Sequence, residues 1–400
     1  MIKRNLENYC FSEDFGKQMR FIAGPRQSGK TTIIKSFLEK KDRLKDYYNW
    51  DYRETRTDFQ KNPDFYNAPI LEKNAWVCFD EIHKYPKWKD ILKEAYDKNV
   101  GEINFVITGS ARLDLFRKSG DSLAGRYFLF RLNPLSLNEL TKVNYPCAIS
   151  CAANEFIRRR LENNHFRQEE MLHLLEFSGF PDPFLSGKRI FHKKWKNDYI
   201  DKVIHEDIRE IAQVREIENI SRLMLLLPVK VGSPLSVNSL MEDMLCSYNA
   251  LRNYLYLMEL SYVTFFVPPY SHGVSRAIKK DKKLYFYDWT RVQDEHMRFE
   301  NYVAMELKIL ADIQNDLGET FSLQYVRKRD GKESDFLLVK DNSPWLLIEV
   351  KTSRQKIASH HYTNAKALGD IPILQIVREN VIAENCGNNS WQVSASRFFA

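Results

Sequence analysis

The first part of the chain alternates short apolar runs with polar stretches of helical periodicity. Residues 19–23, MRFIA, predict a buried strand, and residues 32–40 predict a helix with apolar side chains on one face. Further apolar runs at 76–80, 103–108 and 127–132 predict additional strands. Because strands that alternate with helices are typical of a parallel sheet, we expect an α/β core over residues 1–140.

The middle of the chain has a different pattern. Residues 141–175 show helical periodicity with mixed charge, and a loop containing Gly and Pro follows, which predicts a helical lid or connector over 141–215. Over residues 216–272 we expect helices at 220–229, 236–245 and 248–260, with Ser236 or Asn238 as a helix cap. With the β-rich segments 263–268 and 283–287 after them, these helices predict a winged-helix-like module.

Residues 273–400 return to a mixture of helix and strand. A helix is expected from Arg298, and strands are expected at 321–327, 336–340 and 345–351. The tail includes another strand-like run at 371–377. We therefore expect a second, separate α/β domain at the carboxyl end of the chain.

Composition excludes several classes of protein. The chain has 400 residues, of which 44% are hydrophobic and 28% charged, with only 15 Gly and 14 Pro, so it is neither collagen-like nor wholly disordered. The net charge of +7 permits a polyanionic partner without requiring one. Six cysteines are too few for a disulfide scaffold, and we expect reduced thiols without a zinc site. Without a secretory signal or an apolar run near the roughly 18 residues needed to span a membrane, the sequence predicts a cytoplasmic protein with no membrane partner.

A phosphate-binding motif joins the first predicted strand to the first predicted helix. The segment GPRQSGKTT contains the complete pattern G-x-x-x-x-G-K-[ST] in the strand, loop and helix context that this motif requires. Its glycines allow backbone N–H groups to face a phosphate, while the lysine reaches the β- and γ-phosphates and the threonine hydroxyl holds Mg²⁺. The predicted nucleotide-binding residues are Gly24, Pro25, Arg26, Gln27, Ser28, Gly29, Lys30, Thr31 and Thr32.

Polar residues end two further strands at the same expected sheet edge. A buried strand would deliver Asp80 next to the loop, where it binds Mg²⁺ through water. Glu81 follows and is placed to polarise an attacking water, although a plain loop carboxylate is the alternative. Thr108 ends the next strand and is expected to contact the γ-phosphate, although Thr-Gly-Ser is equally a tight turn. Arg126 lies further on, where three roles stay open: a finger toward a neighbouring subunit's nucleotide, a contact within the same chain, or a brace for its loop.

The carboxyl-terminal strands carry polar residues in an apolar context. Successive side chains of a strand alternate between faces, so Glu349 and Lys351 point the same way from a buried strand. Asp335 heads the adjacent strand and could share that face. Such buried charges need partners or a metal ion. One interpretation is a metal-dependent nuclease site, and the other is a satisfied ion-pair network without activity.

Several motifs resemble those of a known family. GPRQSGKTT, FDEIH at 79–83, ITGS at 107–110, LAGR at 123–126 and PLS at 134–136 are similar to prokaryotic AAA-type ATPases with a "GPRQ-GKTT" loop and a C-terminal domain of formally unknown function. The resemblance runs from about residue 17 to about residue 355. It implies a P-loop NTPase core with a parallel sheet, then a helical lid, a winged helix and a nuclease-like domain of the PD-(D/E)xK kind.

The resemblance also implies roles for the carboxyl-terminal residues. Asp335 and Glu349 would hold Mg²⁺, Glu300 would act as an auxiliary acid, and Lys351 would orient or deprotonate water. Together with Glu81, the residues Asp335, Glu349 and Lys351 are the predicted catalytic set. The predicted metal ligands are Thr31, Asp80, Glu300, Asp335 and Glu349.

Two basic clusters bear on the partner. One cluster is interleaved with Phe191 and Trp195, and a solvated helix face is favoured over DNA contact for it. The other lies at the predicted wing and suits phosphate contacts without base readout. For the winged helix as a whole, a structural or protein-contact role is favoured over DNA contact. The two clusters comprise Lys188, Arg189, Lys193, Lys194 and Lys196, and Arg276, Lys279, Lys280, Lys282 and Lys283.

The sequence therefore predicts an ATP-binding and ATP-hydrolysing protein with Mg²⁺ as cofactor. ATP and ADP are its expected ligands, with DNA and a second copy of the chain as candidate partners. Its carboxyl-terminal region is expected to bind DNA and to be nuclease-like. The alternative is an ATP-gated regulatory or signalling switch that binds a protein partner and cuts nothing.

Overall fold

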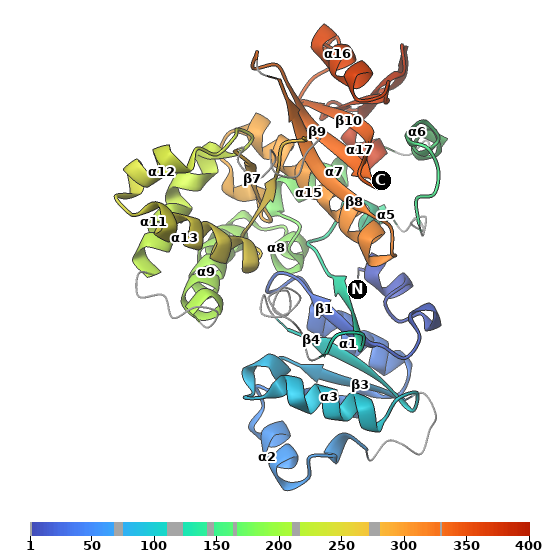
Figure 1. Ribbon diagram of the computed structural model, residues 1–400, viewed down its shortest axis with the longest axis vertical. Helices are drawn as coiled ribbons and strands as arrows, with labels where there is room; N and C mark the ends of the chain where they lie inside the picture. The colour runs from blue at the N-terminus through green and yellow to red at the C-terminus, as the bar shows by residue number, and fades with distance from the viewer. Residues whose placement is uncertain are drawn as a thin grey trace. The chain divides into compact units, whose positions relative to one another are not determined.

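The computed structural model describes residues 2–67, 75–109, 123–141, 148–162, 166–209, 217–271, 281–328 and 330–400 (Figure 1). The chain divides into two compact units. The first unit contains residues 3–133 with 260–262, and the second contains residues 134–259 and 263–400.

The first unit is built on a five-stranded sheet in the order β2-β3-β4-β1-β5. Every pair of neighbouring strands is parallel. The order places β1, which precedes the phosphate-binding motif, between β4 and β5. β1 therefore has a hydrogen-bonded neighbour on each side. The strands are β1 (Met19–Ala23), β2 (Tyr47–Asn49), β3 (Ala75–Asp80), β4 (Ile103–Thr108) and β5 (Tyr127–Arg131).

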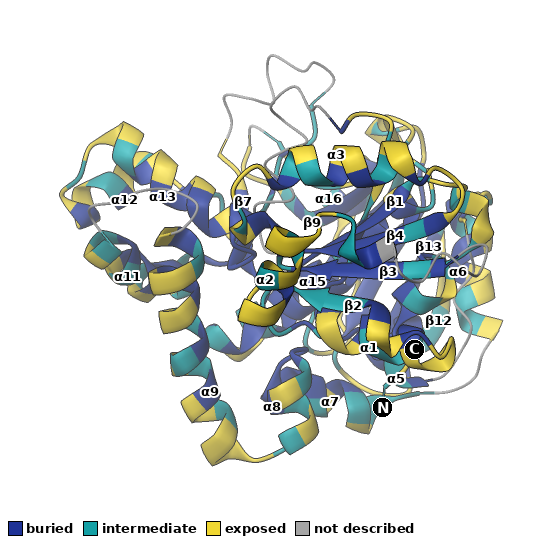
Figure 2. Cartoon of the chain, turned by 90° about the horizontal axis from the view of Figure 1, so that it is seen from below, coloured by how far each residue is buried: buried dark blue, intermediate teal, exposed yellow. Residues whose placement is uncertain are grey.

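Apolar side chains explain why this sheet is buried. β1 is buried along its whole length, and its Ile22 packs with Ile33, Ile34 and Leu38 of α1 (Lys30–Lys40). Figure 2 shows the central strands in the colour of buried residues and α3 (Trp88–Lys98) with one exposed face. A third helix, α2 (Arg53–Lys61), is almost entirely polar and has a single buried residue, Thr55.

The second unit contains a mixed six-stranded sheet in the order β12-β13-β11-β10-β9-β8. The pairs of β10 with β11 and of β11 with β13 are parallel, and the remaining neighbours are antiparallel. The strands are β8 (Phe321–Arg327), β9 (Glu333–Lys340), β10 (Ser343–Lys351), β11 (Ile373–Val377), β12 (Ala383–Gly387) and β13 (Ser390–Ser394).

Three helices accompany this sheet. The longest, α15 (Glu295–Asp316), begins where the Asp294 side chain accepts hydrogen bonds from two backbone N–H groups, and it packs on β8, β7 and β10. α16 (Ser359–Ala367) places Ala365 in an apolar cluster with Leu337 of β9 and Leu347 of β10. The short α17 (Ala395–Phe398) packs against β11 and β13.

The rest of the second unit is helical, with one hairpin. Ser236 caps α12 by accepting a hydrogen bond from the Ser239 N–H, as the sequence indicates. The hairpin pairs β6 (Thr264–Val267) with β7 (Lys283–Phe286) in antiparallel register, at the two segments predicted to form a wing. The helices are α5 (Leu137–Thr141), α6 (Ala153–Glu162), α7 (Gln168–Phe177), α8 (Pro181–Ser186), α9 (Arg189–Lys202), α11 (Ile217–Leu226), α12 (Val237–Met244) and α13 (Tyr248–Leu260).

These features confirm an α/β protein with a parallel sheet in its first part. The first unit ends at residue 133, and the expected boundary at residue 140 stays a prediction. The second unit is not divided further, and the hairpin β6–β7 crosses the expected boundary at residue 272. The boundaries at 215 and 272 therefore stay predictions. Among the described helices, none combines the length and the apolar character needed to cross a membrane.

Candidate functional site

The predicted phosphate-binding loop connects the carboxyl end of β1 to the amino end of α1. Gly24 has φ 151° and lies so close to β5 that an added Cβ would stand 2.2 Å from the carbonyl oxygen of Leu132. Gly29 has φ 98° and directly precedes the helix. Only glycine adopts both positions without strain, so the two glycines set the path of residues 24–29. Thr31 and Thr32 follow as exposed residues in the first turn of α1.

The side chain of Lys30 points into this loop. Its Nζ atom donates hydrogen bonds of 2.8 Å to the carbonyl oxygens of both Gly24 and Pro25. The ammonium is thus held at the centre of the loop, at the positive end of the helix dipole. This is where a phosphate group bound by the loop would lie.

Arg4 also holds the loop, although the sequence motif does not include it. Its guanidinium donates to the carbonyl oxygen of Ser28 at 2.7 Å and to that of Asn133 at 2.6 Å. Both bonds are buried, and Arg4 is 7% exposed. Arg4 therefore ties the backbone of the loop to the segment that follows β5.

Asp80 lies at the carboxyl end of β3, beside the loop, as expected. Its Oδ2 atom accepts a hydrogen bond of 3.1 Å from the Thr31 hydroxyl and one of 3.3 Å from the Asn49 amide. The hydroxyl of Tyr47 donates to the same oxygen, and the Thr108 hydroxyl donates to Oδ1. Side chains from β2, β4 and α1 thus fix the orientation of one buried carboxylate.

Tyr47 keeps its proton in this arrangement. Burial raises the pKa of the Tyr47 phenol, and the negative charge of Asp80 and the hydrogen bond to it raise that pKa further. Tyr47 is therefore a permanent donor to Asp80. The ammonium of Lys35 lies 4.5 Å from the centre of the Tyr47 ring, which is a cation–π contact.

The pair formed by Thr31 and Asp80 fits a magnesium ion. A hydroxyl oxygen and a carboxylate oxygen are ligands that Mg²⁺ prefers, and they are already brought together here. Thr108, in contrast, directs its hydroxyl at Asp80, so the structure brings it to the site as a partner of that carboxylate.

Glu81 follows Asp80 in a left-handed backbone conformation, with φ 58°. Its N–H donates to the carbonyl oxygen of Thr108 at 3.2 Å, and its carboxylate lies 3.6 Å from both His83 Nε2 and Lys84 Nζ. Burial raises the pKa of Glu81, and the charge of Lys30 opposes that rise. A non-glycine residue in this conformation is unusual, and strain of this kind gathers at functional positions.

Arg126 directly precedes β5 and lies at the amino ends of β1 and β5. Its carbonyl oxygen accepts from the N–H of Met19, at the amino end of β1, whereas the phosphate-binding loop follows the carboxyl end of that strand. Its guanidinium pairs with the Asp97 carboxylate at 2.8 and 3.0 Å. The ion pair with Asp97 agrees with a brace for the start of β5, and a contact with a nucleotide bound by the same chain stays a prediction. A role toward a neighbouring subunit stays a prediction.

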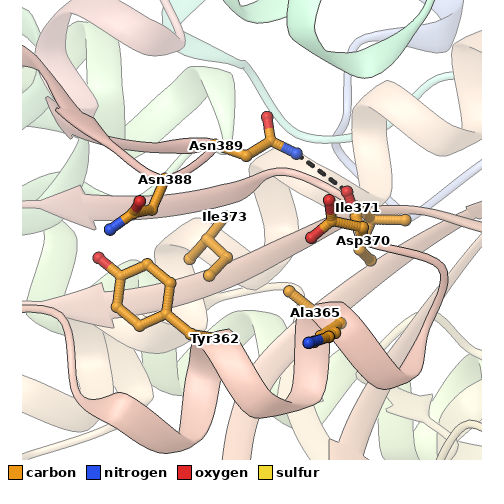
Figure 3. Close-up of a pocket in the computed structure, with 8 residues that line it drawn as sticks. Tyr362, Ala365, Asp370, Ile371, Ile373, Asn388 and Asn389 are labelled. Carbon is orange, nitrogen blue, oxygen red and sulfur yellow. Dashed lines mark hydrogen bonds between the residues drawn. The ribbon is translucent and has the colours of Figure 1, made fainter.

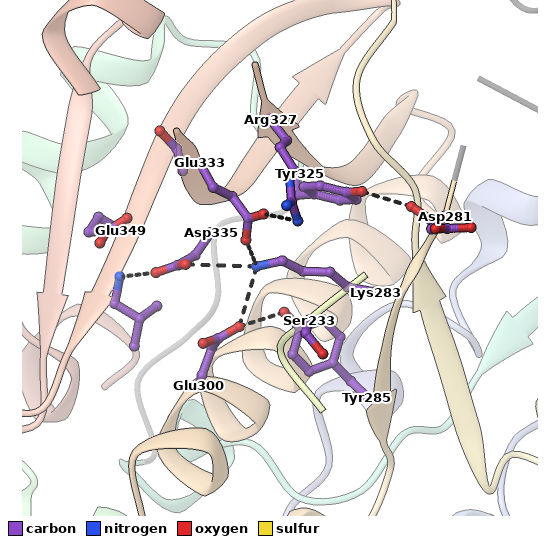
Figure 4. A network of polar contacts seen from close by, with 12 residues as sticks. Ser233, Asp281, Lys283, Tyr285, Glu300, Tyr325, Arg327, Glu333, Asp335 and Glu349 are labelled. Carbon is purple, nitrogen blue, oxygen red and sulfur yellow. Dashed lines mark hydrogen bonds and ion pairs between the residues drawn. The ribbon is translucent and has the colours of Figure 1, made fainter. Parts of the chain in front are cut away.

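The predicted carboxyl-terminal residues also come together, in the second unit (Figure 4). Asp335 of β9 accepts a hydrogen bond of 2.9 Å from the backbone N–H of Val350, which lies between Glu349 and Lys351 on β10. The Lys351 ammonium pairs with Glu349. Glu300 of α15 accepts a bond of 2.7 Å from the Tyr285 hydroxyl and is almost completely buried.

A lysine lies among these carboxylates. The Nζ atom of Lys283 is 2.6 Å from Glu333, 3.6 Å from Glu300 and 3.8 Å from Asp335. Its side chain is 0% exposed, so the sequence-based expectation that Lys283 contacts phosphate groups is wrong. Arg276, Lys279 and Lys280 of the same basic cluster lie outside the described residues.

Glu349 has a second partner that the sequence analysis did not identify. His361 of α16 places Nε2 3.3 Å from the Glu349 carboxylate, and its Nδ1 lies 2.8 Å from the hydroxyl of Ser334. Burial alone would raise the pKa of Glu349, but His361 and Lys351 outweigh it and lower that pKa to about 2. Glu349 is therefore an ionised carboxylate already paired with cationic or polar groups.

The carboxylates of the second unit do not fit a resident metal ion. Within the ranges that the structure describes, no group of three or more His, Cys, Asp or Glu side chains is arranged to hold one. The physical reason is the ammonium of Lys283, which lies between the carboxylates from α15 and β9.

Three of the five residues of the first basic cluster have partners within the chain. Arg189 pairs with Glu176 at 2.5 Å and Lys194 with Asp198 at 2.8 Å, while the Lys196 ammonium donates to the carbonyl oxygen of Thr290. Trp195 is buried and stacks on Tyr199. This geometry agrees with the favoured interpretation, a solvated helix face.

A cleft of about 460 Å³ lies elsewhere in the second unit, between α16 and the amino end of β11 (Figure 3). Tyr362 and Asn388 face it, and the Asn389 amide donates to the carbonyl oxygen of Asp370 at 2.9 Å on one side. None of the predicted site residues lines this cleft.

Comparison with known proteins assigns the two parts differently. Residues 16–141 match the family model described as an AAA domain, and residues 168–290 match one described as a domain of unknown function. Uncharacterized proteins of Mycobacterium bovis and Mycobacterium tuberculosis are each 23% identical over 270 residues, which are 67% of this chain and 53% of theirs. The chain thus spans about half the length of these two relatives.

Two further similarities have greater coverage of the other protein. An uncharacterized protein of Haemophilus influenzae is 23% identical over 349 residues, or 80% of each chain. Among solved structures, a DNA polymerase III gamma subunit-related protein of Thermotoga maritima aligns with a TM-score of 0.26 and 11% identity, covering 64% of this chain and 97% of that one.

Residues 16–141 of the first unit form an AAA domain on a parallel sheet of the P-loop kind. The match over residues 16–141 includes the parallel sheet, the loop with Lys30 and the carboxylate of Asp80. The match and the parallel sheet support the AAA and P-loop parts of the predicted fold. The winged helix and the nuclease-like domain stay predictions.

Proposed function

We propose that this protein binds ATP together with Mg²⁺ and hydrolyses it at the loop formed by residues 24–32. The observation that carries the proposal is the convergence of Lys30, Thr31, Asp80 and Glu81 at one edge of the parallel sheet. The helix α1, the strand β3 and the turn after β3 supply these side chains, and each side chain has the chemistry that phosphoryl transfer requires.

The proposed roles follow from the contacts. Lys30 would exchange its two carbonyl partners for phosphate oxygens, since its ammonium already lies within the loop. Thr31 and Asp80 would hold Mg²⁺, which neutralises charge on the phosphates when bound. Glu81 would orient the attacking water. It follows Asp80 in the chain, and its carboxylate interacts electrostatically with the Lys30 ammonium in the loop.

The test is the steady-state rate of Mg²⁺-dependent ATP hydrolysis by the full chain. Lys30→Ala is expected to lower the rate by about two orders of magnitude or more, as expected for loss of transition-state charge stabilisation. Lys41→Ala is the matched control because Lys41 is an exposed lysine just after the same helix. Hydrolysis that is unchanged in Lys30→Ala would contradict the proposal.

For the second unit, the sequence-based proposal is a DNA-binding region with a winged helix and a metal-dependent nuclease site. The proximity of Asp335, Glu349 and Lys351 on neighbouring strands supports it. Two observations oppose it: Lys283 is buried among the acids, and Arg189 and Lys194 on α9 already have acidic partners.

The second candidate function is therefore an ATP-gated regulatory switch that binds a protein partner and cleaves nothing. The specific observation in its favour is Lys283, which neutralises the carboxylates that a nuclease would use to bind metal. Incubation of supercoiled and linear DNA with Mg²⁺ or Mn²⁺, with and without ATP, distinguishes the two. Cleavage that disappears in Lys351→Ala would establish the nuclease, and absence of cleavage with ATP turnover intact would favour the switch.

A further inference from the structure

Lys283 is an unusual residue for a protein interior. It lies on β7, its side chain is 0% exposed, and it belongs to the largest fully buried side chains of the chain. A lysine is almost never fully buried unless it is paired, since removing its charge from water is costly. Its surroundings must therefore supply compensating negative charge.

The compensation comes from two different elements. Glu333 and Asp335 lie on β9, and Glu300 lies on α15, all within 4 Å of the ammonium in the same unit. The ring centres of Tyr325 and Phe336 lie 5.4 and 5.9 Å from the ammonium. Figure 4 shows the Lys283 side chain among Glu300, Glu333 and Asp335. Burial alone would lower the pKa of Lys283, but the three carboxylates outweigh it and raise that pKa, so the ammonium stays charged.

The carboxylate cluster consists of Glu300, Glu333, Asp335 and Glu349. The last of these has partners other than Lys283. Glu349 pairs with Lys351 and lies 3.3 Å from His361. Glu333 has a second cationic neighbour, Arg327, at 3.5 Å. Each of the described acids in this cluster thus has a positively charged or hydrogen-bonding partner within the chain.

A divalent ion would compete directly with this arrangement. It would need the oxygens of Glu300 and Asp335 at roughly 2.0–2.6 Å, and the ammonium that contacts both lies in the same space. Two cations cannot share these oxygens without strong repulsion.

We propose that Lys283 is the resident cation of this carboxylate cluster and excludes divalent metal ions from it. The second unit then keeps the acids of a metal-dependent site in a metal-free state. Lys283 also joins the hairpin β6–β7 to β9 and α15 through ion pairs. The inference concerns the second unit alone and does not depend on ATP hydrolysis.

The test measures Mn²⁺ binding to the full chain without nucleotide, by electron paramagnetic resonance of the free ion. The wild-type protein, Lys283→Met and the double variant Lys283→Met with Asp335→Asn are compared. Methionine keeps the length of the side chain and removes its charge. Asp80 and Thr31 are present in all three proteins, so any weak binding at the ATPase site cancels in the comparison.

The expected result is one additional Mn²⁺ site in Lys283→Met, bound about tenfold or more tighter than any corresponding site in the wild type. This site should disappear in the double variant. Mn²⁺ should also raise the melting temperature of Lys283→Met, whose acids are otherwise left without their cation, and leave that of the wild type unchanged.

Two results would overturn the proposal. One is a wild-type Mn²⁺ site that Asp335→Asn removes, because the metal would then bind with Lys283 in place. The other is a folded Lys283→Met protein that gains no site, because the acids would then not be a metal site at all. If Lys283→Met does not fold, Lys283→Gln takes its place in the same comparison, and the same two results would overturn the proposal.

Discussion

The Thr31 hydroxyl lies 3.1 Å from the Asp80 carboxylate, although 49 residues separate them in the chain. This contact joins the first turn of α1 to the end of β3 and so completes the ligand pair proposed for Mg²⁺. The parallel order of β3, β4 and β1 makes it possible, because the carboxyl ends of all these strands lie at one sheet edge.

Tyr47→Phe tests whether β2 helps to position Asp80. The change removes one hydroxyl donor and leaves the ring, so the carboxylate keeps Asn49, Thr31 and Thr108 as partners. A hydrogen bond to a charged group contributes roughly 1.5–3 kcal/mol. If part of this energy is lost in the transition state, kcat falls about fivefold or more. The readout is kcat together with the Mg²⁺ concentration required for half-maximal rate, which we expect to rise.

Tyr48→Phe is the matched control for that variant. Tyr48 is the neighbouring residue on β2, and its ring packs against Phe65 and Phe79 instead of Asp80. Its loss of a hydroxyl should leave kcat and the Mg²⁺ requirement at wild-type values. Equal effects of the two changes would argue against a positioning role for Tyr47.

Arg4→Met tests the clamp on the phosphate-binding loop. Two buried hydrogen bonds from the guanidinium, to the carbonyl oxygens of Ser28 and Asn133, would be lost. We expect ATP affinity to fall and the free energy of unfolding of the first unit to fall by about 2–4 kcal/mol, because buried acceptors are left unpaired. Denaturant unfolding and nucleotide titration measure the two effects, and normal affinity in a folded variant would refute the clamp.

Glu306 gives the second unit a predictable dependence on pH. Burial raises the pKa of this carboxyl to about 8 in the folded protein, although its Oε1 accepts from the Leu137 N–H at 2.9 Å. In the unfolded chain the same group ionises near its ordinary value of 4.5. The folded state therefore binds more protons between these values, and stability falls as pH rises from about 4.5 to about 8.

Glu306→Gln should remove that dependence, because the amide stays neutral and still offers an acceptor oxygen. Its melting temperature relative to the wild type should be higher at pH 8.5 than at pH 5.5, by roughly 2–4 °C for each kcal/mol of ionisation cost. Glu169→Gln, at an exposed position on α7, is the control and should shift neither value. A pH-independent difference between Glu306→Gln and the wild type would show that Glu306 does not carry the effect.

Much of the fold follows from local patterns that the sequence displays. β8 spans Phe321–Arg327 as expected, since its apolar positions alternate clearly, and α13 spans Tyr248–Leu260 after the Ser247 cap. The strand β2, by contrast, has three half-buried residues and no periodic signal, so only its pairing with β3 creates it. The hairpin β6–β7 forms from the two segments expected as a wing, and only the expected boundary between them at residue 272 disagrees with it.

The sites show the same division. The loop motif identifies Lys30, Thr31 and Asp80, because phosphate chemistry demands those residues at those spacings. Tyr47 and Arg4 have no such signal, since each acts through a contact made only after folding. The sequence assigns Lys283 to phosphate contacts because it stands in a run of lysines, and its burial becomes visible only through its ion pairs with Glu333 of β9 and Glu300 of α15.

We propose above all that Glu81 orients the water for ATP hydrolysis beside the loop that holds the Lys30 ammonium. Glu81→Gln keeps the size of the side chain and removes its charge, so the most direct measurement follows ATP binding and single-turnover hydrolysis in this one variant. The account predicts ATP affinity near that of the wild type and a hydrolysis rate lower by about 10²-fold or more. Hydrolysis at the wild-type rate by ATP-saturated Glu81→Gln would contradict it.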